Sequence, residues 1–154
     1  MLEQFRKDPA AKSLSYFAAA ENVAIDERTI DQLMGAAMEA NGNARICLHQ
    51  SAEDGFHQML IIEWRGRSFP AHRHPAKSEG YHLIRGRMDL ILYAEDGTER
   101  RRYGLGPEFP IARVGPGTFH ALEVISPYAV YLESKPGPFV RDTDKVMAPW
   151  LDRT

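Results

Sequence analysis

Four residues of this chain have side chains that could bind a metal together, and three of them are close in sequence. His72 and His74 are separated by one residue, and Glu79 follows after four more. His120 comes later, behind the glycine- and proline-rich segment 115–119. Three imidazoles and a carboxylate can bind a divalent cation through mixed nitrogen and oxygen ligands. We therefore predict a metal site formed by His72, His74, Glu79 and His120.

The predicted cofactor is one divalent transition metal: Zn, Fe, Mn or Ni. Imidazole suits most of these ions, and a carboxylate adds tolerance for Mn. A closed structural zinc site would more often use cysteines. Open positions on such an ion could bind water, a substrate oxygen or dioxygen, so the ion could act as a Lewis acid or a redox centre. The alternative is histidines without metal, and the added Glu79 and His120 argue against it.

The ligand spacing is typical of β-strands. Residues two apart on an extended strand point to the same face, so His72 and His74 would point together and Arg73 away. The segment 75–78 begins with a proline and lets the chain turn before Glu79 starts a neighbouring strand. His120 would then arrive from a separate hairpin.

After Asn43 the chain consists of short runs rich in β-branched and aromatic residues, separated by Gly, Pro and Asp. This pattern predicts a mainly β fold, a small sandwich or barrel. Arg85-Gly86 and Asp96-Gly97 are typical of hairpin turns because glycine tolerates positive φ. The predicted strands are 44–49, 58–64, 80–85, 88–94, 99–103, 119–124 and 128–133.

The N-terminal part has a different pattern. Apolar residues at helical spacing predict a helix over about 26–40, capped by Asp26 or Thr29 and stopped by Asn41-Gly42-Asn43. Residues 13–17 could form a short strand. The helix would pack on the outside or at one end of the barrel.

These patterns divide the chain into three parts. Residues 1–43 form an N-terminal extension, 44–136 a barrel, and 137–154 a C-terminal strap. The aromatic residues Phe139 and Trp150 would anchor the strap to the barrel.

Bulk properties narrow the function classes. A chain of 154 residues fits one domain, and its net charge of −2 offers no broad basic field for nucleic acid. The single cysteine, Cys47, cannot form an intrachain disulfide and fits a reducing compartment. Neither a secretory leader nor a run long enough to span a membrane is evident. We predict a cytoplasmic protein with no nucleic-acid or membrane partner.

The stretch from Gly66 to Gly86 resembles the first motif of the cupin superfamily at every fixed position. The second cupin motif is partly present: Gly115 and Val124 stand where it has a proline and an asparagine. The resemblance implies a cupin-type double-stranded β-helix, a small β-barrel or jelly roll open at one end. It also implies dimers and metal ligation by His72, His74, Glu79 and His120. The early strands could extend a partner's sheet by edge pairing.

A narrower resemblance is carried by 45–49, 59–62, 70–75, 77–82, 133–139 and 148–150. These segments look like the WbuC-type cupin-fold metalloproteins, which occur in bacterial surface-polysaccharide (O-antigen) gene clusters. The resemblance implies polysaccharide biosynthesis as a context and names no reaction.

Four further residues are candidates for binding a substrate. Arg45 and His49 are four apart on a predicted strand, so they could face the same side and bind an anionic group. The alternative is that one of them caps a turn and the other is solvated. Lys77, in the ligand loop, could contact a carboxylate or phosphate, or be solvated. Tyr81 shares the parity of Glu79 and could stack on a sugar ring or fill the core.

Glu133 is the candidate catalytic residue. It lies late in an apolar strand. If its side chain points inward, it could serve as a general base or hold a ligand histidine in its tautomer; otherwise it lies in water at the end of the strand. His82 has the opposite parity to Glu79 and is predicted not to be a ligand. His57 is predicted to lie at the surface.

Three functions fit these residues. The first is a metal-dependent enzyme on a small polar substrate, such as a carbohydrate or sugar-nucleotide intermediate, acting as an isomerase or epimerase or as a dioxygenase. The second is a non-catalytic sugar- or metabolite-binding module with a metal anchor. The third is a structural metal that ties strands together.

Overall fold

The structure is a computed structural model and describes residues 2–151. Within this range the chain forms one helix, α1 (Glu27–Glu39), and ten strands. The strands are β1 (Phe5–Lys7), β2 (Leu14–Ala18), β3 (Ala44–Cys47), β4 (Phe56–Trp64), β5 (His72–Arg73), β6 (Glu79–Tyr93), β7 (Glu99–Leu105), β8 (Ile111–Val114), β9 (Phe119–Pro136) and β10 (Val146–Met147).

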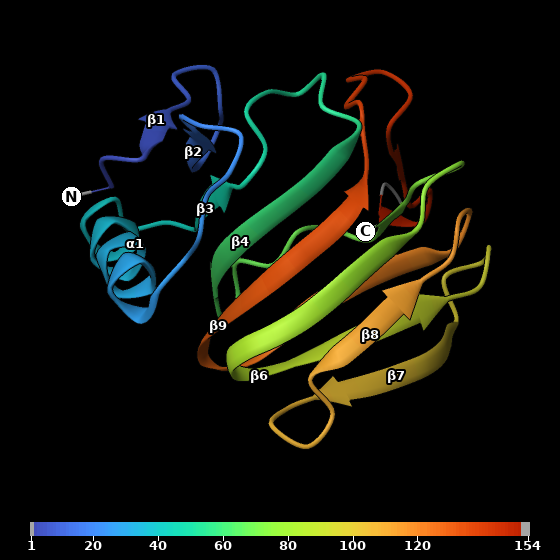
Figure 1. Ribbon diagram of the computed structural model, residues 1–154. Coiled ribbons are helices and arrows are strands. Elements are labelled where there is room, and N and C mark those ends of the chain that lie inside the picture. Colours follow the sequence, from blue (N-terminus) through green and yellow to red (C-terminus); the bar gives the residue numbers. More distant parts are fainter. Residues whose placement is uncertain (1, 152–154) are drawn as a thin grey trace.

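Two long, bent strands organise the barrel (Figure 1). β6 and β9 pair antiparallel over two stretches, and the register shifts between them. Around the first stretch, β9 also pairs with β4 and β6 with β8; around the second, β9 pairs with β5 and β6 with β7. The predictions of a mainly β fold and of a small barrel with an N-terminal helix are confirmed.

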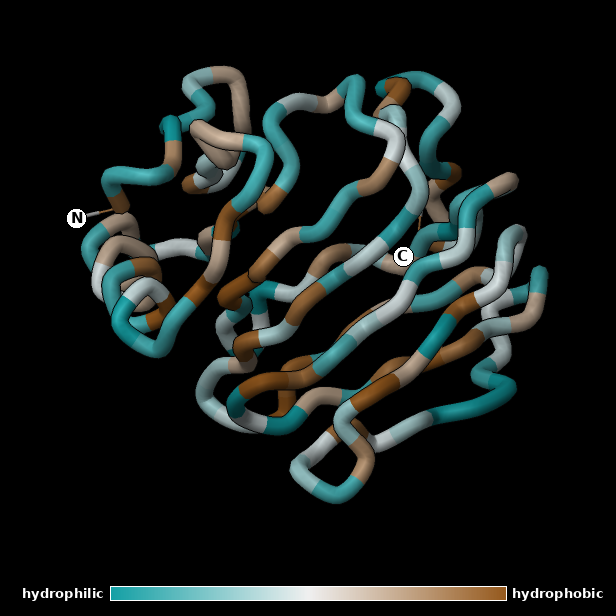
Figure 2. Tube along the Cα trace, viewed as in Figure 1, coloured by the Kyte–Doolittle hydropathy of each residue, from teal (hydrophilic) through white to brown (hydrophobic). Residues whose placement is uncertain are grey.

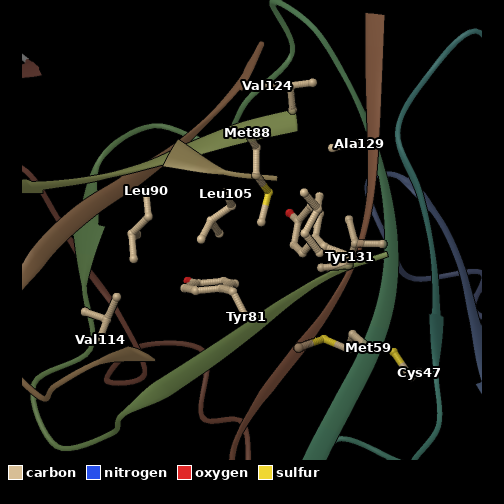
Figure 3. Close-up of a cluster of buried hydrophobic side chains, with 12 residues drawn as sticks. Cys47, Met59, Tyr81, Met88, Leu90, Leu105, Val114, Val124, Ala129 and Tyr131 are labelled. Atoms are coloured by element: carbon tan, nitrogen blue, oxygen red, sulfur yellow. The ribbon is translucent and has the colours of Figure 1, made fainter. Parts of the chain in front are cut away.

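The barrel encloses an apolar core (Figure 3). Alternate side chains of β4 belong to two different apolar clusters. Met59 and Ile61 point into the barrel, whereas Leu60 and Ile62 point toward the helix. The inner cluster includes Tyr81 and residues from both halves of β6 and β9. Cys47 is also buried there, and burial raises the pKa of its thiol to about 11. It is therefore the small buried hydrophobe that its apolar neighbours predict.

The helix covers the outer face of β3 and β4 (Figure 1). Asp26 caps it, because the backbone N–H of Thr29 donates to Asp26 Oδ1 at 2.8 Å. It ends before Asn41, whose φ of 47° stops the helical path. Its apolar face, formed by Ile30, Leu33 and Ala37, packs into the second cluster. Figure 2 shows apolar residues on this face and along the barrel strands. No helix among residues 2–151 is long and apolar enough to cross a membrane.

Two strand boundaries differ from the prediction. Arg85-Gly86 is not a hairpin, because β6 runs through it with a register shift. Gly86 has φ 91°, and a Cβ there would lie 2.3 Å from the carbonyl oxygen of Tyr128. The glycine therefore allows a bulge and a close backbone approach inside a continuous strand. Similarly, the predicted strands 119–124 and 128–133 form the single strand β9.

The other predicted hairpin is confirmed. Asp96-Gly97 lies between β6 and β7, and the backbone N–H of Ala94 donates to the carbonyl of Thr98 at 2.8 Å. Gly97 has φ 92°, and a Cβ there would meet the ring of Trp150 at 2.9 Å.

The strap lies across the barrel beside β5. β10 pairs antiparallel with β5, and Trp150 packs on Phe119 with ring centroids 5.0 Å apart. Trp150 therefore anchors the strap as predicted. Phe139 does not, because its side chain is 43% exposed and only its backbone N–H bonds to Ala52. Residues 152–154 of the predicted strap, and residue 1 of the predicted extension, lie outside the described residues. The division into extension, barrel and strap stays a prediction.

Candidate metal centre

Three segments bring the predicted ligands together. His72 on β5 pairs directly with His120 at the start of β9. Glu79 is the first residue of β6, and His74 follows β5 by one residue. The ligand atoms of His72, His74 and Glu79 all lie within 4.8 Å of one another. This is the spacing expected of side chains that share one ion.

His120 lies next to this group of three. Its Nε2 atom is 2.8 Å from Oε2 of Glu79, and its ring centroid is 4.8 Å from that of His72. His120 is 1% exposed, so it closes the buried side of the cluster. Its role as fourth ligand stays a prediction.

All three histidines are oriented in the same way. Each Nδ1 atom faces a backbone carbonyl oxygen, which can only accept a hydrogen bond, so Nδ1 carries the proton. In a neutral ring the Nε2 atom then keeps a lone pair for a metal. The acceptors for His72, His74 and His120 are the carbonyls of Pro70, Asp144 and Thr118, at 2.9, 2.5 and 2.9 Å.

The Nε2 atom of His74 provides a test of metal fit. It is buried and has no hydrogen-bond partner among the described residues, yet Oε1 of Glu79 lies 2.9 Å away. When the ring is neutral, with its one proton on Nδ1, the lone pair of Nε2 faces a carboxylate oxygen. A buried polar atom without a partner costs about 1–3 kcal/mol. A cation bound by both atoms would remove this cost, so these residues fit a metal ion.

The charge states of His72 and Glu79 also suit a metal. Burial lowers the pKa of His72 to about 4, so its ring is neutral at pH 7. Burial alone would raise the pKa of Glu79, but contacts with His120, His74 and Lys135 outweigh it and hold the pKa below its usual range. Burial opposes protonation of His120, but the contacts with Glu79 and the Thr118 carbonyl raise its pKa.

Tyr81 and Lys135 hold Glu79 in place. The Tyr81 hydroxyl donates to Oε2 of Glu79 at 2.7 Å, and Lys135 Nζ lies 3.2 Å from Oε1. The Tyr81 ring is 3% exposed and lies in the core beside Tyr131 (Figure 3). This position fits the core-filling alternative rather than stacking on a sugar. Burial raises the pKa of Tyr81, so its hydroxyl stays protonated and can donate.

Charged side chains line the partly exposed side of the cluster. Lys135 Nζ is 3.1 Å from a carboxylate oxygen of Glu133, the candidate base. Lys77 forms an ion pair with Asp144, whose backbone carbonyl orients His74. The strap therefore contributes to the site. The sequence reasoning missed Lys135 and Asp144, although Lys135 has the same strand parity as Glu133.

The structure does not bring Arg45 and His49 together on a strand face. β3 ends at Cys47, before His49, so alternation does not extend to that residue. The guanidinium of Arg45 donates to Ser15 Oγ at 2.9 Å. His49 stacks on His57, with ring centroids 4.0 Å apart. His57 is only 3% exposed, so the prediction that it lies at the surface is wrong. His82 is exposed, as its parity predicts.

The fold and these converging side chains define a protein of cupin-type fold with a candidate metal centre. Residues 25–105 match the family described as "Domain of unknown function (DUF6016)", and the chain belongs to this family. No protein with curated annotation matches the sequence.

Solved structures with a similar fold include two kinds of cupin-fold protein. Capsular polysaccharide assembling protein CapF from Staphylococcus aureus has a TM-score of 0.59 and 14% identity, over 80% of this chain and 33% of CapF. Oxalate decarboxylase from Lactobacillus farciminis, in a formate complex, has a TM-score of 0.51 and 14% identity, over 66% of this chain and 29% of the enzyme.

The oxalate decarboxylase of Bacillus subtilis, described with Mn(II) centres, has a TM-score of 0.50 and 21% identity, over 61% of this chain and 24% of that one. This chain thus spans a third or less of the length of each of these proteins. At such low identity the likeness shows the cupin fold.

Proposed function

We propose that this chain is a metal-dependent enzyme that acts on a small polar substrate. His72, His74, Glu79 and His120 bind one divalent transition metal: Zn, Fe, Mn or Ni. The observation that carries the proposal is the buried Nε2 atom of His74, which has no hydrogen-bond partner among the described residues and faces Glu79. The matching orientation of the three histidines supports it.

The residues around the ligands have separate roles in this proposal. When bound, the metal would supply Lewis-acid or redox chemistry at its open positions. Tyr81 and Lys135 hold Glu79 in a fixed direction. Glu133 is the carboxylate on the partly exposed side that can accept a proton from a substrate. Both an isomerase or epimerase and a dioxygenase fit these roles.

The proposed substrate is a carbohydrate or sugar-nucleotide intermediate of surface-polysaccharide synthesis. The resemblance to the WbuC-type proteins supports this context, and CapF is itself described as a capsular polysaccharide assembling protein. Of the four candidate binding residues, Lys77 and Tyr81 lie beside the ligands. Arg45 and His49 would bind a part of the substrate that lies further from the metal.

The test is metal analysis followed by turnover. Purified protein would be analysed for bound metal and assayed with a panel of nucleotide-activated sugars, with and without a chelator. We expect one metal per chain and turnover that the chelator abolishes. His74→Ala should lose both, whereas His82→Ala, at an exposed histidine, should keep both. Absence of metal from the reconstituted protein would contradict the proposal.

A second candidate is a sugar- or metabolite-binding module with a metal anchor. Its specific support is that Glu133, the proposed base, is already engaged in an ion pair with Lys135, at 3.1 Å. This candidate predicts metal-dependent binding of a sugar without conversion. A purely structural metal, the third alternative, predicts a lower melting temperature for Glu79→Gln and His120→Ala and no accessible coordination position.

We also propose a homodimer in the cytoplasm. β1 lies at one edge of the sheet order, so its outer backbone groups could pair with a partner's strand. The single, buried cysteine supports a reducing compartment. Light scattering that gives the mass of one chain would contradict the dimer.

A further inference from the structure

Lys135 is a charged side chain in an unusual place. It has the strand parity of Tyr131 and Glu133 on β9, so it points into the barrel rather than to solvent. Its side chain is only 13% exposed. Its ammonium group lies 3.2 Å from Oε1 of Glu79 and 3.1 Å from Glu133. Burying an ammonium costs several kcal/mol unless it is paired, so both carboxylates keep it charged there.

The charges around the site leave one positive charge without a partner once a divalent ion is bound. Glu133 pairs with Lys135, and Asp144 pairs with Lys77. The remaining carboxylate is Glu79, whose single negative charge would offset half of the charge of the ion. The three imidazoles contribute no charge when neutral. At a centre this buried, an unmatched positive charge strongly favours an anion.

We infer that the ligand completing the metal centre is a small monoanion, such as a carboxylate, that contacts both the ion and Lys135, and that Lys135 is the specificity-determining residue that holds it beside the metal. This inference rests on the proposed metal site and states the charge of the group that binds at the metal. Lys135 can take this role because an ammonium has three donors, and its contacts with Glu79 and Glu133 use two of them.

The other nearby cations are less suited to this role. The ammonium of Lys77 is held by the carboxylate of Asp144 and by the carbonyl of Pro138. The guanidinium of Arg45 contacts Ser15, away from Glu79. Lys135 is the lysine that contacts Glu79 directly.

The test uses the full chain reconstituted with Co²⁺, whose visible spectrum reports a change of ligand. The probes are glycolate and its neutral analogue glycolamide. The variants are Lys135→Gln, which removes the charge, and Lys135→Arg, which keeps it. Lys145→Gln, at an exposed lysine of the strap, is the control. Affinity for Co²⁺ is measured separately by competition with a chelator.

We expect opposite effects of Lys135→Gln on the two affinities. Glycolate affinity should fall about tenfold or more, because a charged partner is lost. Co²⁺ affinity should stay equal or rise, because a positive charge beside the ion is removed. A merely structural lysine would lower both. Lys135→Arg and Lys145→Gln should bind glycolate within about threefold of the unaltered chain, and glycolamide should bind weakly to all of them.

Two results would overturn the inference alone: equal glycolate affinity in Lys135→Gln, or glycolamide binding as tight as glycolate. If Lys135→Gln does not fold, Lys135→Arg and the comparison of glycolate with glycolamide still decide. Failure of the unaltered chain to bind Co²⁺ would instead contradict the proposed metal site, and the inference with it.

Discussion

His74 Nε2 and Glu79 Oε1 lie 2.9 Å apart in the barrel, and both residues are 3% exposed. The proton of His74 is on its other nitrogen, which donates to the carbonyl of Asp144. When the His74 ring is neutral, two lone pairs therefore face each other where water is largely excluded. A cation between them resolves this arrangement, and the proposed function rests on that pair.

Replacing Glu79 tests the electrostatic part of this argument. Glu79→Gln keeps the size of the side chain and removes its charge, so we expect metal affinity to fall at least about tenfold. Isothermal titration with Zn²⁺ or Mn²⁺ would measure the change. His82→Ala should leave the affinity unaltered. Equal affinity of Glu79→Gln and the unaltered chain would remove Glu79 from the ligand set.

Trp150 should stabilise the barrel as well as the strap. Its ring packs on Phe119, Tyr93 and Gly97. Because Trp150 is only partly buried, Trp150→Ala should lower the free energy of unfolding by about 2 kcal/mol, less than for a fully buried tryptophan. Phe139→Ala, at an exposed aromatic, is the matched control and should change it little. Urea denaturation would measure both, and similar losses would contradict the assignment of Trp150 as the anchor.

Gly86 should not tolerate a side chain. Its φ of 91° is strained for other residues, and an added Cβ would lie 2.3 Å from the carbonyl oxygen of Tyr128. We expect Gly86→Ala to cost about 3 kcal/mol of stability, from backbone strain and the clash together. Gly35→Ala, in the helix with no atom within 4 Å of the added Cβ, should stabilise by about 0.5–1 kcal/mol. Thermal unfolding of both variants would compare them, and a stable Gly86→Ala would show that the bulge can relax.

The stacked pair of His49 and His57 should make stability depend on pH. Burial, and then the neighbouring His57, lower the pKa of His49 from 6.5 to about 4. Between these two pH values, His49 is protonated in the unfolded chain and neutral in the folded chain. Stability from this residue is therefore complete above pH 6.5 and falls as the pH drops toward 4, by about 3 kcal/mol at most.

The measurement is the free energy of unfolding at pH 7 and at pH 4.5. His49→Asn cannot titrate in this range, so the variant should lose less stability between the two values than the unaltered chain. His82→Asn, at an exposed histidine, should show the full loss. The same loss in His49→Asn as in the unaltered chain would assign the pH effect to other residues.

Three of the four proposed metal ligands are close together in the sequence, so this part of the candidate site could be predicted from local spacing. His72, His74 and Glu79 lie within eight residues; strand alternation predicts one side for His72 and His74, and Glu79 begins the next strand. The cap at Asp26 and the turn at Asp96-Gly97 also follow from short-range rules. In these places, a few neighbouring residues determine the structure.

Other features depended on contacts between distant parts of the chain. Gly86 has the composition of a hairpin, but its close approach to Tyr128 decides that it forms a bulge. His57 follows a turn and is buried by His49 and Gly137. Strand alternation was expected to place Arg45 and His49 on one face, but β3 ends at Cys47, before His49. Lys135 could be recognised as part of the site only when β9 was placed beside β6.

The strap connects the metal centre to an exposed peptide. The carbonyl that orients His74 belongs to Asp144, seventy positions further along the chain, and residues 138–143 before it are exposed. Cleavage by a protease within that stretch would leave the barrel strands whole and still free a ligand ring to rotate. Retention of a bound ion would therefore be sensitive to proteolysis at a site that takes no part in binding it.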